Sequence, residues 1–193
     1  MIHLKARPRP TRSMSQLVSE IIATGGRELE REDEFQQWFF GRRGEAGGML
    51  RIKLPCWHQY VFGRAILPKY HADLQFYNNE RCFAELKVMF ERKKYLFVME
   101  TCQEREPLAP LTEAADRLAK SSADVTLLVF SANPFGQTEE FLSRIDGLSG
   151  VEGRSGVHRF RTKNDKDEDY EFWVGGWRVA SRQSAATGGR ALG

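Results

Sequence analysis

The chain has 193 residues, of which 41% are hydrophobic and 28% charged, a composition that suits one globular domain with its own core. The 29 lysines and arginines against 26 acids leave a net charge of only +3, so any basic surface must be local. Three widely spaced cysteines form no CxxC or Cys/His cluster, which argues against a zinc site and indicates reduced thiols.

The two ends of the chain differ in composition from its middle. Residues 1–13 contain one lysine, three arginines and two prolines and predict a flexible basic arm, whereas residues 181–193 are rich in Ser, Ala and Gly and predict a disordered tail. Residues 14–180 are expected to form a single α/β domain. The sequence has no apolar run of signal-peptide or membrane-spanning length, so we expect a cytoplasmic protein without a membrane partner.

The first third of the chain predicts two helices followed by strands. A helix is expected to begin at the Ser13 cap and to end at Gly25 and Gly26, and a second to cover residues 27–40. Residues 49–54 alternate between apolar and basic, and residues 57–66 are aromatic and β-branched, so both segments predict strands.

The remainder predicts an α/β fold in which helices flank a mixed β-sheet on both sides. The apolar run 124–131 is typical of a central strand that is covered on both faces. The other expected elements are strands 74–77, 82–90 and 95–99, helices 107–121 and 138–145, and a hairpin of strands 157–163 and 170–174.

One predicted hairpin brings chemically active side chains together. If residues 78–80 form its loop, Asp73 lies opposite Glu85. Because side chains alternate along a strand, Lys87 shares the face of Glu85, and the apolar neighbours occupy the other face. The sequence therefore predicts two acids and a lysine on one side of a sheet.

These residue types suit phosphodiester hydrolysis. A carboxylate pair is a fitting ligand for Mg²⁺ or Mn²⁺, so Asp73 and Glu85 are the candidate metal ligands. Such an ion stabilises charge on a scissile phosphate and lowers the pKa of a bound water. Lys87 can orient that water or help to deprotonate it, which makes Asp73, Glu85 and Lys87 the candidate catalytic residues.

At Asp73, Glu85 and Lys87 the sequence resembles the PD-(D/E)xK nuclease superfamily, and the order of elements over residues 27–147 resembles it as well. The resemblance implies a restriction-endonuclease-like core, metal binding by the two acids and a lysine that serves the attacking water. It also implies an assisting acid on the first core helix, for which Glu34 or Glu30 is the candidate.

The sequence departs from that family in two places. Ala72 precedes Asp73 where the family has proline, and the apolar segment 95–99 stands between the motif and the next helix, where many members proceed directly to the helix. The tripeptide ExK is common in unrelated proteins, so the match depends on its register with Asp73.

Other interpretations of the same residues stay open. The three polar residues can form a solvated sheet face with an ion pair, and a helical segment 83–100 would separate Glu85 from Lys87. The alternatives to a metal-dependent nuclease are a non-catalytic module that binds nucleic acid or protein on the same fold, and a partner-binding protein without a nucleic-acid role.

A basic strand face offers a test between these functions. Arg159, Arg161 and Lys163 share one face by their period of two and are candidates for binding a nucleic-acid backbone, with DNA favoured over RNA. Their position near the carboxylates would favour the nuclease or the non-catalytic module, and a position on the far side would favour the partner-binding protein. The sequence leaves open whether the chain forms a homodimer.

Overall fold

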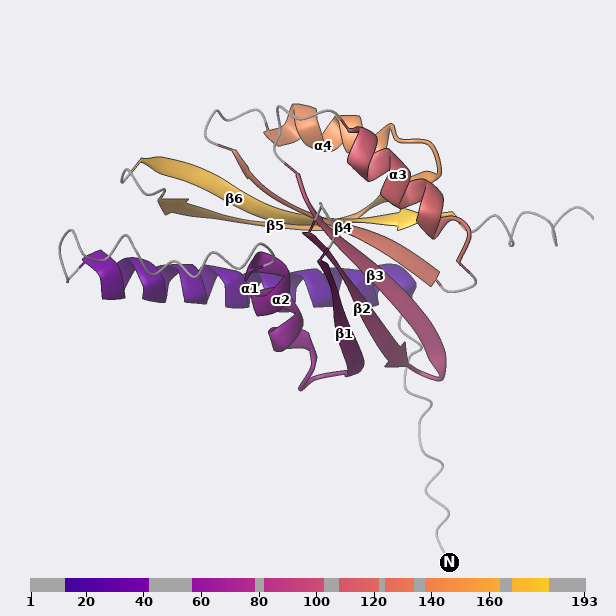
Figure 1. The fold of residues 1–193 in the computed structure, drawn as a ribbon, viewed down its shortest axis with the longest axis horizontal. Helices are drawn as coiled ribbons and strands as arrows, with labels where there is room; N and C mark the ends of the chain where they lie inside the picture. The colour runs from indigo at the N-terminus through magenta and orange to yellow at the C-terminus, as the bar shows by residue number, and fades with distance from the viewer. Residues whose placement is uncertain are drawn as a thin grey trace, which may run out of the picture.

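The computed structural model describes residues 13–41, 57–78, 82–102, 108–121, 124–133, 138–163 and 168–180. Within these ranges a sheet lies between two layers of helices (Figure 1). The elements are α1 Met14–Gly41, α2 Trp57–Ile66, β1 His71–Asn78, β2 Cys82–Phe90, β3 Lys93–Thr101, α3 Ala109–Leu118, β4 Asp124–Asn133, α4 Thr138–Asp146, β5 Val151–Lys163 and β6 Asp169–Val179.

In the described residues the sheet has six strands, in the order β1-β2-β3-β4-β6-β5. β1, β2 and β3 form an antiparallel meander, and β4 then pairs with β3 in parallel after the crossover through α3. β6 is antiparallel to both β4 and β5, so the sheet is mixed. The predicted mixed sheet flanked by helices on both sides is confirmed, and β1 and β5 are the outermost of the described strands.

Each face of the sheet carries its own apolar core. α1 and α2 cover one face, where Phe62 packs among residues such as Leu86 of β2 and Phe130 of β4. α3 and α4 cover the other face, where Leu111 and Trp173 are buried. The central strand β4 contributes to both cores, because alternate residues of its apolar run point to opposite faces, as the sequence predicts.

The prediction that a helix ends at Gly25 and Gly26 is wrong, because α1 continues through both residues to Gly41. These glycines allow close packing. A Cβ added to Gly25 would lie 2.2 Å from the Phe62 ring of α2, and one added to Gly26 would lie 2.4 Å from the His158 ring of β5. Their small size therefore serves the contacts of α1 with its neighbours and does not end the helix.

The strand predicted for residues 57–66 is also wrong, since this segment is α2. Its buried residues Gln59, Phe62 and Ile66 recur at helical spacing, and that periodicity outweighs the aromatic and β-branched composition that favoured a strand. The opposite concern, a helical segment 83–100, is excluded, because β2 and β3 occupy this region.

Several expectations concern residues that lie outside the described ranges. They are the basic arm before Ser13, the tail 181–193 and the strand 49–54. The C-terminal hairpin of β5 and β6 is present, with strands longer than predicted.

Candidate functional site

The candidate site lies on the β1–β2 hairpin. Leu74 of β1 and Leu86 of β2 point to the core formed with α1 and α2. By alternation, Asp73 and Gln75 of β1 and Glu85 and Lys87 of β2 point to the other face. We call these four residues, Asp73, Gln75, Glu85 and Lys87, the polar face.

The predicted register of the hairpin is wrong by two residues. Asp73 lies opposite Lys87, and Glu85 lies opposite Gln75, because Asn78 and Cys82 form the last pair before the turn. A shift of two residues preserves the side of the sheet on which each side chain lies. The two acids and the lysine therefore share a face, but the carboxylates are diagonal neighbours instead of direct partners.

Close contacts join the four side chains. Gln75 Nε2 donates a hydrogen bond to Asp73 Oδ2 at 3.0 Å, and Lys87 Nζ donates one to Gln75 Oε1 at 3.1 Å. Lys87 Nζ also lies 3.9 Å from Glu85 Oε2. Gln75 thus links Asp73 to Lys87, and it is a member of the site that the sequence analysis missed. Its place two residues from Asp73 on the same strand is the signal that could have found it.

The polar face lies in solvent at the margin of the sheet. Asp73, Gln75 and Lys87 are exposed, whereas Glu85 is half-buried. Toward the centre of the sheet the same face is covered, since Leu96 and Val98 of β3 pack into the core under α3 and α4. Arg117 of α3 marks the limit of this cover, with its guanidinium 4.6 Å from the Phe83 ring centroid and 3.5 Å from Glu100.

The polar face offers oxygen atoms to a divalent cation. Diagonal neighbours in an antiparallel pair have Cβ atoms up to about 7–8 Å apart, a span that one bound ion and two carboxylate side chains can bridge. The amide oxygen of Gln75 accepts a hydrogen bond from Lys87, and the amide nitrogen donates one to Asp73. Among the described residues, no cluster of three or more His, Cys, Asp and Glu side chains suited to a metal occurs, so the donor set here is a carboxylate pair and an amide.

The assisting acid expected on the first core helix is not near the polar face. α1 packs on the opposite side of the sheet, against the core that contains Leu86. Glu30 Oε2 contacts His158 Nε2 of β5 at 3.1 Å, which places it toward the other edge of the sheet. Glu34 is exposed on the same helix. Neither acid supports the role that the resemblance implied.

The basic strand face lies far from the polar face. Arg159 and Arg161 belong to β5, at the edge opposite β1, so about 24 Å of sheet separates them from Asp73. Arg159 hydrogen-bonds Glu139 of α4, and this bond, with the charge of Arg154, lowers the pKa of Glu139. The side chain of Lys163 lies outside the described residues. This arrangement favours the partner-binding alternative.

Comparisons with known proteins identify no relative of this chain. The chain matches no protein-family model, and no significant similarity to a curated protein or to a solved structure was found. In the part of the chain that the structure describes, none of the helices combines the length and the apolar character needed to cross a membrane.

Proposed function

We propose that the chain is a metal-dependent nuclease that hydrolyses nucleic-acid phosphodiester bonds at the polar face of β1 and β2. The observation that carries the proposal is the contact network of Asp73, Gln75, Glu85 and Lys87 in solvent at the margin of the sheet. The resemblance of Asp73, Glu85 and Lys87 to the PD-(D/E)xK motif supports it.

The donor chemistry of the polar face fits Mg²⁺ or Mn²⁺. Both ions prefer hard oxygen ligands, which Asp73, Glu85 and the Gln75 amide provide. A bound ion would supply positive charge for the phosphate and a water of lowered pKa. Without an ion, two acids on one face repel each other, and the nearby ammonium of Lys87 offsets part of that repulsion.

Lys87 has two roles in this proposal. Its ammonium already contacts Gln75 and Glu85, so it would lie beside a water or phosphate oxygen that binds at the polar face. From there it can orient the attacking water and offset phosphate charge. In the reaction the water oxygen bonds to phosphorus, one P–O ester bond breaks, and the departing alkoxide takes up a proton.

The second candidate is a non-catalytic, partner-binding protein on the same fold. The observation that favours it is the position of Arg159, which lies at the far edge of the sheet and is engaged by Glu139. In that case the contacts of the polar face form an ordinary solvated network, in which an exposed ion pair contributes only about 0–1 kcal/mol of stability.

A cleavage assay separates the two candidates. Purified protein is incubated with mixed-sequence DNA and RNA, single- and double-stranded, in Mg²⁺, Mn²⁺ or EDTA. The nuclease proposal predicts cleavage of at least one substrate in Mg²⁺ or Mn²⁺ and none in EDTA. Absence of cleavage on every substrate, together with absence of Mn²⁺ binding by calorimetry, would support the partner-binding protein instead.

A further inference from the structure

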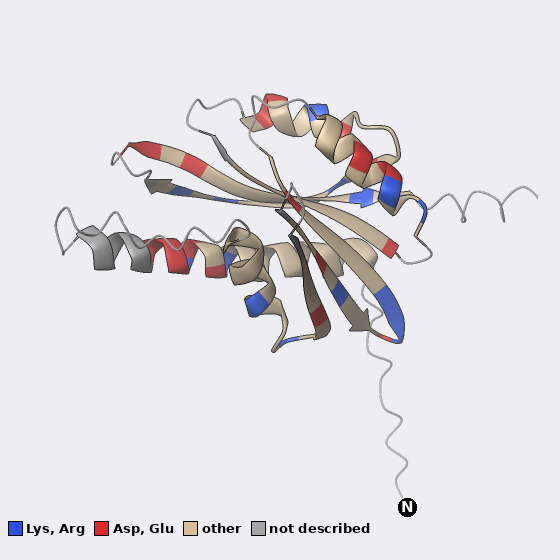
Figure 2. Cartoon of the chain, viewed as in Figure 1, with Lys and Arg blue, Asp and Glu red and all other residues tan. Residues whose placement is uncertain are grey.

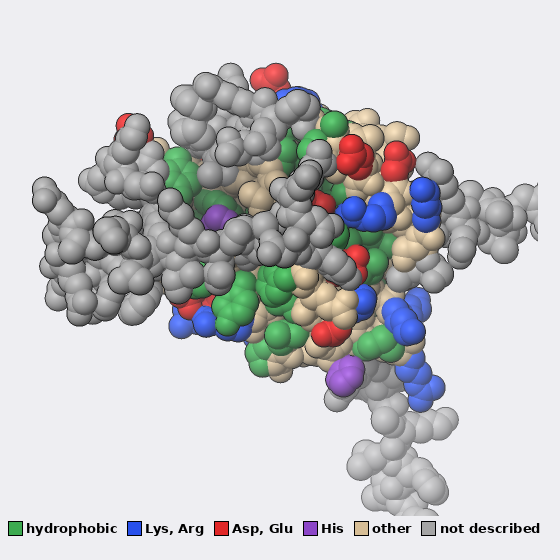
Figure 3. Space-filling view, viewed as in Figure 1, with side chains coloured by type: hydrophobic (Ala, Val, Ile, Leu, Met, Phe, Trp, Pro, Cys, Tyr) green, Lys and Arg blue, Asp and Glu red, His purple; other side chains and the backbone are tan. Residues whose placement is uncertain are grey.

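A group of cations lies at the end of the sheet next to the polar face. Lys69 lies between α2 and β1, Arg92 lies in the two-residue turn between β2 and β3, and Lys93 and Lys94 begin β3. All four side chains are exposed. We call these residues, Lys69, Arg92, Lys93 and Lys94, the basic end. Figure 2 shows Lys and Arg in blue at the β2–β3 turn, and Figure 3 shows blue side chains gathered at the same place.

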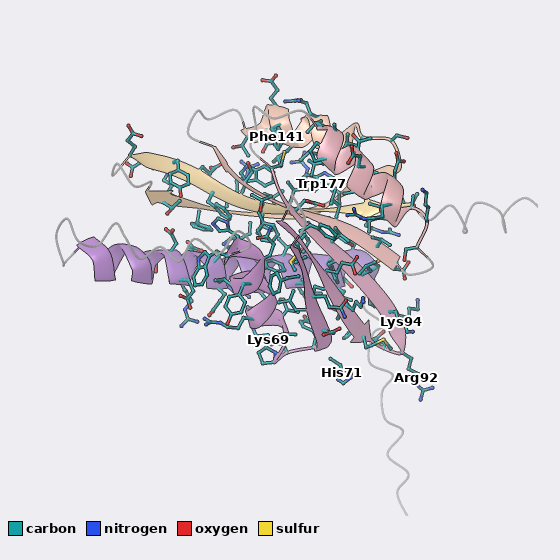
Figure 4. All side chains as sticks on the ribbon, viewed as in Figure 1. Lys69, His71, Arg92, Lys94, Phe141 and Trp177 are labelled. Carbon is teal, nitrogen blue, oxygen red and sulfur yellow. The ribbon has the colours of Figure 1, made fainter. Side chains whose placement is uncertain are left out.

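Strand register connects the basic end to the polar face. His71 of β1 pairs with Met89 of β2, which pairs with Lys94 of β3, so these residues form a row about 10 Å long. The next row inward on this face contains Asp73 and Lys87. Figure 4 shows Lys69, His71, Arg92 and Lys94 at this one end of the molecule. The basic end therefore borders the candidate site, unlike Arg159.

The cations of the basic end are not neutralised within the protein as other arginines are. Arg64, Arg117, Arg154, Arg159 and Arg178 all form ion pairs with acids. In the described ranges, no such pair or side-chain hydrogen bond involves Lys69, Arg92, Lys93 or Lys94. Two acids stand nearby, Asp124 at the start of β4 and Glu91 in the turn, and burial together with their charges raises the pKa of Tyr95.

The turn itself has an unfavourable sequence for its conformation. Glu91 and Arg92 both have positive φ, at 48° and 66°, and they join the paired residues Phe90 and Lys93 as a two-residue loop. Asn-Gly is the usual sequence for such a loop, because other L-residues rarely adopt this backbone. A strained turn that keeps Arg92 at its tip indicates a use for that side chain beyond folding.

We propose that the basic end binds the phosphate backbone of the nucleic acid and leads it onto the polar face, an inference that rests on the proposed nuclease function. Exposed cations without internal partners can release counterions from a polyanion. A flat anionic membrane would bring Asp73, Glu85 and Glu91 against its own charge at once, whereas a single phosphate backbone can follow the basic end first and meet the acids of the polar face only where the proposed cation would offset their charge. These contacts reach phosphates and carry no sequence preference.

Binding is measured separately from cleavage, by fluorescence anisotropy of labelled single- and double-stranded oligonucleotides in EDTA. The test variant is Arg92→Gln/Lys93→Gln/Lys94→Gln. The matched control, Arg27→Gln/Lys120→Gln/Arg144→Gln, removes the same charge from exposed positions on α1, just after α3 and on α4. We expect the test variant to bind at least about 10-fold more weakly and to lower the salt slope by about 2–3, and the control to change binding less than about 3-fold.

A second variant separates the charge from the fold. Arg92→Gly should raise Tm by about 2–4 °C by relieving the positive φ at that residue, and should nevertheless weaken binding because it removes one cation. Equal losses in the test and control triples, no binding by the wild type in EDTA, or binding only to phosphatidylserine vesicles would overturn the proposal. If the test variant Arg92→Gln/Lys93→Gln/Lys94→Gln binds and cleaves nucleic acid as the wild type does, the proposal for the basic end is wrong and the nuclease proposal stands. If the wild type binds nucleic acid through the basic end but cleaves none, the nuclease proposal is wrong and the basic end still binds phosphates.

Discussion

Replacement of Asp73 by alanine is expected to reduce metal-dependent cleavage by about 10²–10³-fold, a loss comparable to the removal of one preorganised charge-stabilising group from an active site. The carboxylate is one of two that can hold the cation on the polar face. The folded protein should be almost unaffected, because Asp73 is exposed and its side chain accepts one hydrogen bond from Gln75. Initial cleavage rates in Mg²⁺ and the thermal unfolding midpoint, measured on the same preparation, check both parts.

The matched control is Glu140→Gln, which removes an exposed carboxylate from the first turn of α4, away from β1. Its cleavage rate should equal that of the wild type.

Replacement of Lys87 by alanine is expected to give a different pattern. It should slow cleavage more than it weakens Mn²⁺ binding, since lysine acts on the water and the phosphate. Cleavage that survives both Asp73→Ala and Lys87→Ala would place the activity at another site or in a contaminant.

Replacement of Trp177 by alanine is expected to lower the free energy of unfolding by about 3–5 kcal/mol, the range for removing a large aromatic side chain from a core. Trp177 is 0% exposed in the core under α3 and α4, its ring packs edge-on to Trp173, and its Nε1 donates a 2.7 Å hydrogen bond to Asp146. Urea unfolding followed by far-ultraviolet circular dichroism measures the change.

Two companion variants locate the cause of that loss. Trp177→Phe keeps a ring in the core but removes the hydrogen bond to a carboxylate, so it should cost about 1.5–3 kcal/mol. Trp57→Ala removes the same residue type from a half-buried position at the start of α2, and it should cost less than half as much as Trp177→Ala. Losses of equal size at positions 57 and 177 would contradict the described core.

The parts of the fold that the sequence predicts well are those in which local pattern and burial agree. β4 is one, since an apolar run of strand length has no other place than the centre of a covered sheet. α3 is another, because Leu111, Ala115 and Leu118 form one helical stripe that becomes its buried face. The order of strands and helices from β1 to β6 follows from such segments.

The wrong predictions share a cause in tertiary contacts. Gly25 and Gly26 resemble a helix end locally, but the rings of Phe62 and His158 require small residues at that point of α1. Residues 57–66 favour a strand by composition, yet they pack as a helix against α1 and the sheet. Neither neighbour can be identified from the local sequence.

The candidate site shows how far register can be inferred. Alternation along a strand places Asp73, Glu85 and Lys87 on one face whichever even register the hairpin adopts. Which residues face each other depends on the turn, and three adjacent polar residues do not identify its limits. The observed register substitutes Lys87 for Glu85 as the partner of Asp73 and brings Gln75 into the group.

The central claim, that Asp73 and Glu85 hold one divalent cation, is tested most directly by Mn²⁺ titration of the ¹⁵N-labelled protein. Paramagnetic broadening at less than one equivalent should begin at the amides of Asp73, Gln75, Glu85 and Lys87 and spare those of β5, at the far edge of the sheet. The pattern should disappear in Asp73→Ala. Broadening that begins elsewhere, or that is unchanged in Asp73→Ala, would contradict the account.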